Sequence, residues 1–152
     1  MAITDIKKKK AKPFIYLHGT VTVAYEKVPE GGGRIMDALQ PLVEGKDVLA
    51  GPSVWTYRDG GPGKLVLRAG FQVKSGTRGK AGYAARKEPE WHCLSAMYKG
   101  PMPRIIDAWH ALMEHAESKG IECSDERREI YLKWVGVDSK ANVTELQLRL
   151  RK

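Results

Sequence analysis

The chain has 152 residues, of which 42% are hydrophobic and 29% are charged, the proportions of an ordinary globular domain. No apolar run is long enough to cross a bilayer, and the short stretch Phe14–Leu17 after the basic N-terminus is too short for the apolar region of a secretory signal. Two cysteines, Cys93 and Cys123, are too few for a disulfide framework. These features argue against a membrane-spanning helix and a disulfide-stabilised secreted domain, so we expect a cytoplasmic protein that does not bind membranes.

The net charge of +8 is concentrated in two segments. Lys7–Lys10 and Lys12 supply five positive charges ahead of the first expected strand, and segment 75–90 is rich in glycine, lysine and arginine. Charge runs of this kind are usually solvated. We therefore expect residues 1–13 to form a flexible basic tail and segment 75–90 a connector, with a phosphate-binding arm as the alternative. Specific nucleic-acid binding is not expected.

The first half of the chain predicts a strand, a helix and two further strands. The alternation of Val21 and Val23 with threonines is typical of a strand. Gly31–Gly33 predicts a break before a short helix, and Pro41 predicts that this helix is kinked or ends early. The expected elements are a strand over 14–28, a helix over 35–43, and strands over 54–57 and 64–73.

The second half repeats this order with clearer signals. Ile105, Trp109, Leu112 and Ala116 recur at helical spacing, and Gly120 marks the helix end. In the last strand leucines alternate with polar residues, which predicts one buried face. The expected elements are a strand over 91–98, a helix over 105–116, and strands over 129–134 and 143–150.

The repeated order of elements predicts an α+β fold in a single domain, 14–152, made of two strand–helix–strand–strand halves. The halves are residues 14–74 and 91–152. Each half has one sheet face and one helix stripe to bury, so two halves can close one core. We expect a mainly antiparallel sheet, two main helices and a central pocket where the halves meet.

Motifs for nucleotide cofactors and metals are missing. Segment 76–80 has two residues between its glycines where a Walker A loop needs four, and Gly31–Gly33 lacks dinucleotide-binding spacing. His110 and His115 lie about 140° apart around their helix, so they cannot chelate one metal from that helix. We expect no cofactor and no metal.

Aromatic residues give the strongest functional signal. Four tryptophans and six tyrosines accompany only two phenylalanines, and Trp and Tyr combine a flat apolar surface with a polar group. On their expected strands, Trp55 and Tyr57 share a face, and Glu129 and Tyr131 share a face. A small-molecule site lined by these residues is our hypothesis.

Two interpretations of Glu129 stay open on the residues alone. Glu129 could pair with Arg127 or Arg149 on an open sheet face, because charged side chains are rarely buried unless paired. Alternatively it could be the anionic floor of an aromatic pocket that receives a cation. Trp109 could likewise be a core residue or a pocket wall. Trp91 is a further candidate for the pocket, whereas we expect Trp134 in the core.

Several short motifs occur in a fixed order in the second half: Tyr98-Lys99-Gly100-Pro101, Ala108-Trp109, Leu112, Gly120, Arg128-Glu129-Ile130-Tyr131-Leu132 and Thr144-Glu145-Leu146. In this order they resemble the GyrI-like small-molecule-binding family, which also supplies the effector-binding domains of AraC- and MerR-type regulators. The resemblance implies a duplicated fold with a central pocket. It also implies that Glu129 receives cationic aromatic ligands in a multidrug-binding site, with Tyr131 as its aromatic neighbour. Trp134-Val135-Gly136 departs from the family's usual proline-containing turn.

The resemblance favours a stand-alone domain that binds a small hydrophobic, cationic or aromatic molecule, as a sensor or for sequestration. A regulatory output would then require a protein partner. Because some relatives hydrolyse cyclopropane-containing alkylators, the alternative is a hydrolase with Glu129 as its catalytic residue. Whether the protein is an enzyme is therefore open at this point.

Overall fold

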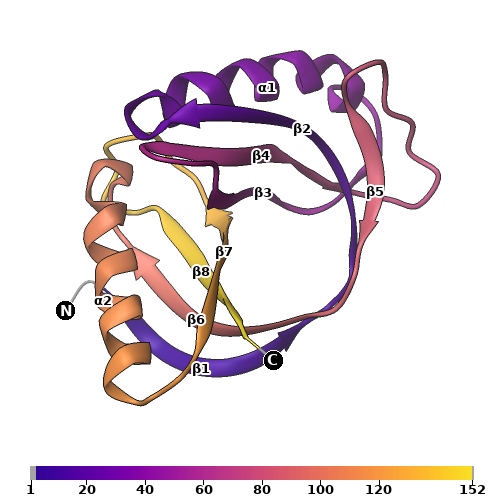
Figure 1. Ribbon diagram of the computed structural model, residues 1–152. Helices are drawn as coiled ribbons and strands as arrows, with labels where there is room; N and C mark the ends of the chain where they lie inside the picture. The colour runs from indigo at the N-terminus through magenta and orange to yellow at the C-terminus, as the bar shows by residue number, and fades with distance from the viewer. Residues whose placement is uncertain (1–2, 152) are drawn as a thin grey trace. The chain divides into compact units, whose positions relative to one another are not determined.

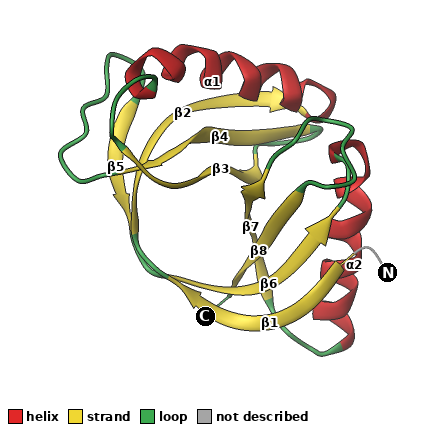
Figure 2. Ribbon diagram, turned by 180° about the vertical axis from the view of Figure 1, so that it is seen from behind, coloured by secondary structure: helices red, strands yellow, loops and turns green. Residues whose placement is uncertain are grey.

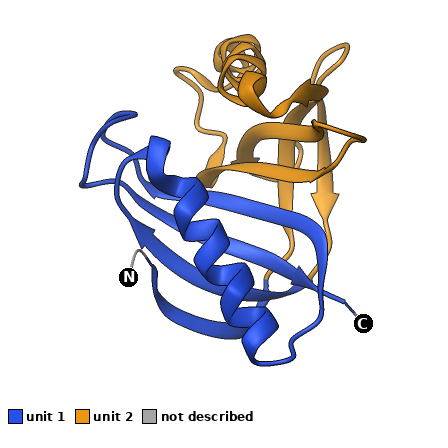
Figure 3. Ribbon diagram, turned by 60° about the vertical axis from the view of Figure 1, so that its left-hand side comes forward, with its two compact units in different colours: residues 1–11, 91–152 blue, residues 12–90 orange. Residues whose placement is uncertain are grey.

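The computed structural model describes residues 3–151 and divides into two compact units, coloured separately in Figure 3. Unit 2 is the continuous segment Lys12–Glu90, and unit 1 combines the N-terminal segment up to Ala11 with the chain from Trp91 onward. Segments 14–74 and 91–152 thus fall in different units, and the basic segment before Lys12 belongs to the unit of the second segment.

Unit 2 is a four-stranded antiparallel sheet with a helix on one face (Figure 1). Its elements are β2 (Phe14–Ala24), the 3-10 helix η1 (Tyr25–Lys27), α1 (Val28–Val43), β3 (Leu49–Asp59), β4 (Lys64–Val73) and β5 (Ala84–Glu88). The strand order is β3-β4-β2-β5. The core between α1 and the sheet consists of Leu17, Ile35, Leu39, Val43, Ala69 and Val73.

Helix α1 begins at Val28, so the expected break at the glycine triplet is wrong. The triplet lies inside the helix, and Gly32 is buried under the ring of Trp55, where a Cβ atom would collide with the indole. Glycine weakens a helix by about 1 kcal/mol relative to alanine, but here it allows a close approach of helix and strand. Pro41 lies in the last turn, directly before the helix ends at Val43.

Unit 1 has the same organisation, with α2 lying along one face of its sheet (Figure 2). Its elements are β1 (Ile3–Ala11), β6 (Trp91–Lys99), the 3-10 helix η2 (Met102–Arg104), α2 (Ile105–Ser118), β7 (Cys123–Lys133) and β8 (Val143–Leu150). The strand order is β1-β6-β8-β7, and all pairs are antiparallel. No helix within residues 3–151 is long and apolar enough to span a membrane.

The expected flexible tail is wrong, because residues 3–11 form strand β1 along β6. Ile3 and Ala11 are buried at its two ends, and the side chain of Lys9 lies over the sheet. Long lysine stems can cover apolar surface while their ammonium groups reach water or a partner. The run of lysines hid the period of two that otherwise marks a strand.

Segment 75–90 is also more ordered than a connector. Its second part forms β5, which pairs with Phe14–His18 of β2. Each unit therefore contains the expected strand–helix–strand–strand order plus one edge strand, and the predicted antiparallel α+β fold class is confirmed. The expectation of one buried face on β8 is wrong, since Glu145 and Gln147 on its polar face are buried as well.

Candidate functional site

The carboxylate of Glu129 is the centre of the candidate site, in unit 1. The residue is 5% exposed, and each of its carboxylate oxygens accepts a hydrogen bond from an aromatic side chain. The indole Nε1 of Trp109 donates to Oε2 at 2.8 Å, and the hydroxyl of Tyr131 donates to Oε1 at 2.6 Å. Hydrogen bonds to charged groups contribute about 1.5–3 kcal/mol each, so the carboxylate is held in one orientation.

The strand register explains this geometry. Glu129 pairs with Leu146 and Tyr131 pairs with Thr144, and Leu146 belongs to the core packed against α2. Alternate residues of a strand share a face, so Glu129 and Tyr131 both point toward α2, and they share a face as predicted. Trp109 lies in the buried stripe of that helix and reaches the carboxylate. Trp109 is thus both a core residue and a hydrogen-bond donor to the carboxylate.

Arg149 does not serve as the surface partner that the sequence suggested for Glu129. Its register partner on β6 is Cys93, on the other face of the sheet from Leu146, and it forms an ion pair with Glu126 at 2.9 Å. The burial of Glu129 contradicts its expected place on an open sheet face, whereas a role in ligand binding stays a prediction from the sequence.

Trp134 adds a third aromatic side chain beside Tyr131. The prediction that Trp134 lies in the core is wrong. It is 52% exposed, and its ring contacts that of Tyr131 edge to face, with centroids 5.9 Å apart. The turn that carries it is fixed by buried Asn142, whose Oδ1 accepts from the amide of Val135 at 2.8 Å and whose Nδ2 donates to the carbonyl of Gly136. In the sequence, only the departure of this turn from the family pattern distinguished Trp134 from a core residue.

The other aromatic candidates belong to other strands. Trp55 and Tyr57 belong to unit 2, where they share the face of β3 that packs toward α1, as their spacing predicts. Trp91 is in unit 1 but lies on the sheet face opposite Glu129, where it packs with Cys93. The guanidinium carbon of Arg128 lies 3.8 Å from the centroid of its ring. The register thus separates Trp91 from Glu129 by the thickness of the sheet, and its assignment to ligand binding stays a prediction from the sequence.

A second polar cluster, on the same face as Trp91, was missed. The Oε2 atom of buried Glu145 accepts hydrogen bonds from the hydroxyl of Ser95 and the amide of Gln147, each at 2.9 Å, and forms an ion pair with Lys9 at 2.6 Å. Burial raises the pKa of Glu145, but the hydrogen bonds from Gln147, Lys9 and Ser95 outweigh it, so the pKa lies below its usual value. The alternation of β8 made this face look solvent-exposed.

The thiol of Cys93 is buried beside this cluster. Burial, followed by the nearby charge of Glu145, raises its pKa to about 11, so it stays protonated at neutral pH and is a poor nucleophile. Within residues 3–151, no group of three or more His, Cys, Asp or Glu side chains is arranged to hold a metal ion.

A scan of protein-family models finds none that matches this sequence, and a search of curated proteins finds no match either. Solved structures do match. The C-terminal domain of EcmrR has a TM-score of 0.75 at 19% identity, with 100% of this chain and 99% of that domain covered. In the EcmrR–DNA complex, the chain spans 57% of the length of EcmrR.

Two further structures cover nearly the whole chain. SAV2435 bound to tetraphenylphosphonium has a TM-score of 0.65 at 10% identity, covering 97% of this chain and 94% of SAV2435. A hydrolase from Listeria innocua has a TM-score of 0.58 at 12% identity, covering 96% of this chain and 91% of the hydrolase. At such identities the likeness establishes the fold alone. The chain has the GyrI-like effector-binding fold that its motifs predict.

Proposed function

We propose that the protein binds a hydrophobic organic cation in unit 1, with Glu129 as the anionic partner, as a sensor or for sequestration. The observation that carries the proposal is a buried carboxylate whose two oxygens are each held by an aromatic donor, Trp109 and Tyr131. A small-molecule site typically combines an apolar aromatic lining with a few fixed polar groups.

The arrangement suits a cation for two physical reasons. A carboxylate has about four lone-pair positions, so it can accept hydrogen bonds from the donors that orient it and attract a ligand's positive charge at the same time. Away from water this attraction is stronger than at the surface. The rings of Tyr131 and Trp134 lie edge to face beside it, and a cation over such a ring gains about 0.5–2 kcal/mol.

The tetraphenylphosphonium complex of SAV2435 supports this ligand class, because a protein of the same fold holds a bulky aromatic cation. We extend this comparison to the proposal that the site of this chain accepts several hydrophobic cations, as a multidrug-binding site does. The assignment of Trp55 and Tyr57 to ligand binding stays a prediction from the sequence, and the proposal depends on unit 1 alone.

Tetraphenylphosphonium is the natural probe, and tetraphenylborate is its size-matched anion. Because the protein carries a net charge of +8, non-specific electrostatics would favour the anion. We expect the opposite, with the cation raising the melting temperature more than tetraphenylborate or neutral triphenylphosphine oxide. Equal or larger shifts with the anion would contradict the proposal.

Glu129→Gln tests the residue itself. Loss of one charge from a desolvated pair costs about 2–5 kcal/mol, so tetraphenylphosphonium affinity should fall by roughly 30-fold to several thousand-fold in calorimetry. Glu122→Gln, at an exposed position of unit 1, is the matched control and should bind as the native protein does. Unchanged affinity in Glu129→Gln would remove this carboxylate from the site.

A hydrolase that uses the same carboxylate is the second candidate. It is supported by the likeness in fold to the Listeria innocua hydrolase. A fixed buried carboxylate can act as a general acid or base toward an electrophile. Incubation with a cyclopropane-containing alkylator, followed by mass spectrometry, should then show a hydrolysed product with the native protein but not with Glu129→Gln. Equal rates with both proteins would exclude this role.

A further inference from the structure

The edge strand β5 covers only part of β2. It pairs with Phe14–His18, whereas β2 continues to Ala24 and pairs with β4 over almost its whole length. Among residues 3–151, no strand pairs with Gly19–Ala24 on the β5 side. A strand edge of this kind presents unpaired backbone N–H and C=O groups and can accept another strand.

A tight turn directly before β5 lies at this point. Lys80 and Tyr83 exchange two backbone hydrogen bonds of 2.9 and 2.8 Å, and Gly82 inside the turn has a φ of +84°, which favours glycine. The turn places the ring of Tyr83 on Gly19, where a Cβ atom would lie 2.8 Å from the ring. The open edge therefore begins where Tyr83 blocks the extension of β5.

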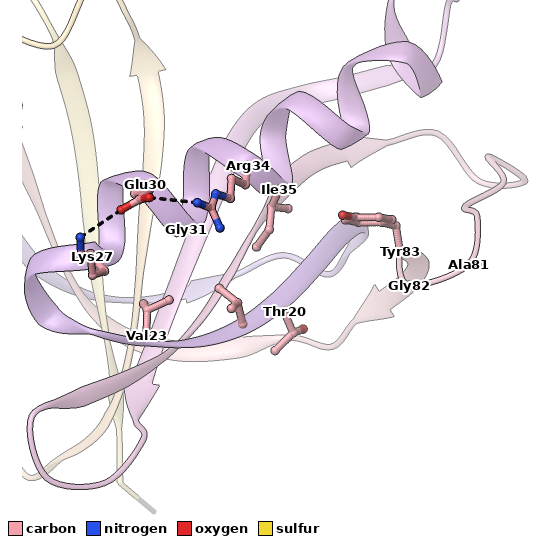
Figure 4. Close-up of a pocket in the computed structure, with 11 residues that line it drawn as sticks. Thr20, Val23, Lys27, Glu30, Gly31, Arg34, Ile35, Ala81, Gly82 and Tyr83 are labelled. Carbon is pink, nitrogen blue, oxygen red and sulfur yellow. Dashed lines mark hydrogen bonds and ion pairs between the residues drawn. The ribbon is translucent and has the colours of Figure 1, made fainter.

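A cavity of about 700 Å³ lies along this open edge, within unit 2 (Figure 4). Thr20, Val21 and Val23 of β2 form its floor, and Ile35 with the first turns of α1 forms one wall. Tyr83 closes one end. Because consecutive residues of a strand point to opposite faces, a cavity lined by both Thr20 and Val21 includes the strand's edge.

The rim of the cavity is basic. Arg34 and Lys27 both pair with Glu30, as the dashed lines in Figure 4 show, and their side chains are 79% and 64% exposed. The ammonium of Lys80 lies 5.4 Å from the centroid of the Tyr83 ring. Arg34, Lys27 and Glu30 line the cavity and leave one positive charge in excess, and Lys80, which contacts the lining residue Tyr83, adds a second.

We propose that the β2 edge, Gly19–Ala24, binds an acidic protein segment in extended conformation, which adds to the sheet as a strand in line with β5. In such β-addition the main-chain hydrogen bonds supply affinity and alternate side chains supply specificity. Six paired residues span about 20 Å at about 3.4 Å per residue. On the α1 side of the sheet, apolar side chains of the segment meet Val21, Val23 and Ile35, and acidic ones meet Arg34 and Lys27 on that same side. A second copy of this chain is a poorer occupant, because it would bring the same positive charges to the edge.

The probe is the acetylated, amidated peptide Glu-Thr-Val-Thr-Glu-Thr, in which valine and the two glutamates share one face. Bound to the full-length protein, it should slow hydrogen exchange of amides within Gly19–Ala24, as measured by NMR. The same peptide with lysine in place of glutamate, and a version N-methylated at alternate amides, should not bind. The first control tests charge and the second tests main-chain hydrogen bonding.

Arg34→Glu should weaken binding of the acidic peptide about five-fold or more, whereas Lys46→Glu, an equal charge change at an exposed position after α1, should not. Tetraphenylphosphonium binding should be unchanged in Arg34→Glu, which separates this proposal from the Glu129 site. Equal binding of the N-methylated peptide, protection of other amides only, or self-association through this edge would overturn the proposal.

Discussion

Lys9 and Glu145, which come from near opposite ends of the chain, form an ion pair of 2.6 Å across strand β6. The carboxylate is buried, and the Lys9 side chain is 31% exposed. The hydroxyl of Ser95, on the intervening strand, donates to the same oxygen. The first strand is thereby tied to the last one by side chains as well as through its backbone pairing with β6.

Lys9→Gln should destabilise the protein, because it removes a charged donor from a buried carboxylate. A loss of about 1–3 kcal/mol in the free energy of unfolding is expected from urea denaturation. Lys10→Gln is the control, since that side chain is exposed, and it should change stability by less than about 0.5 kcal/mol. Equal effects of the two substitutions would show that the ion pair does not contribute.

Glu145 should make stability depend on pH in the acidic range. Its folded-state pKa lies below the ordinary value of 4.5, so its contribution is complete above pH 4.5 and is lost as the pH falls through the folded-state pKa. In Glu145→Gln, the free energy of unfolding should be lower at pH 7 and should fall less steeply below pH 4.5. Parallel curves for the two proteins would contradict this assignment.

His18 should act in a higher pH range and in the same direction, because its folded-state pKa is also lowered. Burial, followed by the charges of Arg68 and Arg86, lowers its pKa from 6.5, although a hydrogen bond to the Tyr16 carbonyl and the charge of Glu88 oppose this. The unfolded chain then binds the proton more readily, so stability falls as the pH drops below 6.5. His18→Gln should flatten the stability curve between pH 7 and pH 5. His110→Gln, which removes a histidine at an exposed position, is the matched control.

Trp134→Ala should reduce tetraphenylphosphonium affinity about two- to thirty-fold, because one cation–π contact contributes about 0.5–2 kcal/mol. The melting temperature without ligand should change little, since the side chain is half exposed. Val137→Ala, at a similarly exposed position of the same turn, is the control. Unchanged affinity in Trp134→Ala would restrict the aromatic lining to Trp109 and Tyr131.

Local signals predicted most of the fold. Strands β4 and β8 begin and end at the expected residues, and α2 follows its apolar stripe, because alternation and helical spacing depend on near neighbours. Strand β1 could not be predicted in this way, since its lysines mask the buried positions. The early start of α1 was also hidden, because the fit of Gly32 under Trp55 depends on a contact distant in sequence.

In the candidate site too, features set by near neighbours were predicted and features set by contacts distant in sequence were not. Alternation predicted that Glu129 and Tyr131 share a face, and the motif resemblance singled out both. The contact of Trp109 with Glu129 depends on how α2 packs on the sheet. The position of Trp91 on the other face is set by the register of β6 against β8, which is a long-range property that no single segment encodes.

The sharing of strands between distant parts of the chain has a consequence during synthesis on the ribosome. Unit 2 is one continuous segment, so its sheet can form once residues up to Glu90 have emerged. Strand β1 is made first, but its partner β6 begins at Trp91 and the carboxylate that binds Lys9 is near the end of the chain. Strand β1 therefore stays unpaired until β6 has been synthesised, and lysines on an unpaired strand discourage pairing with other nascent chains. The charge run Lys7–Lys10 thus keeps the first strand available for the last part of the chain.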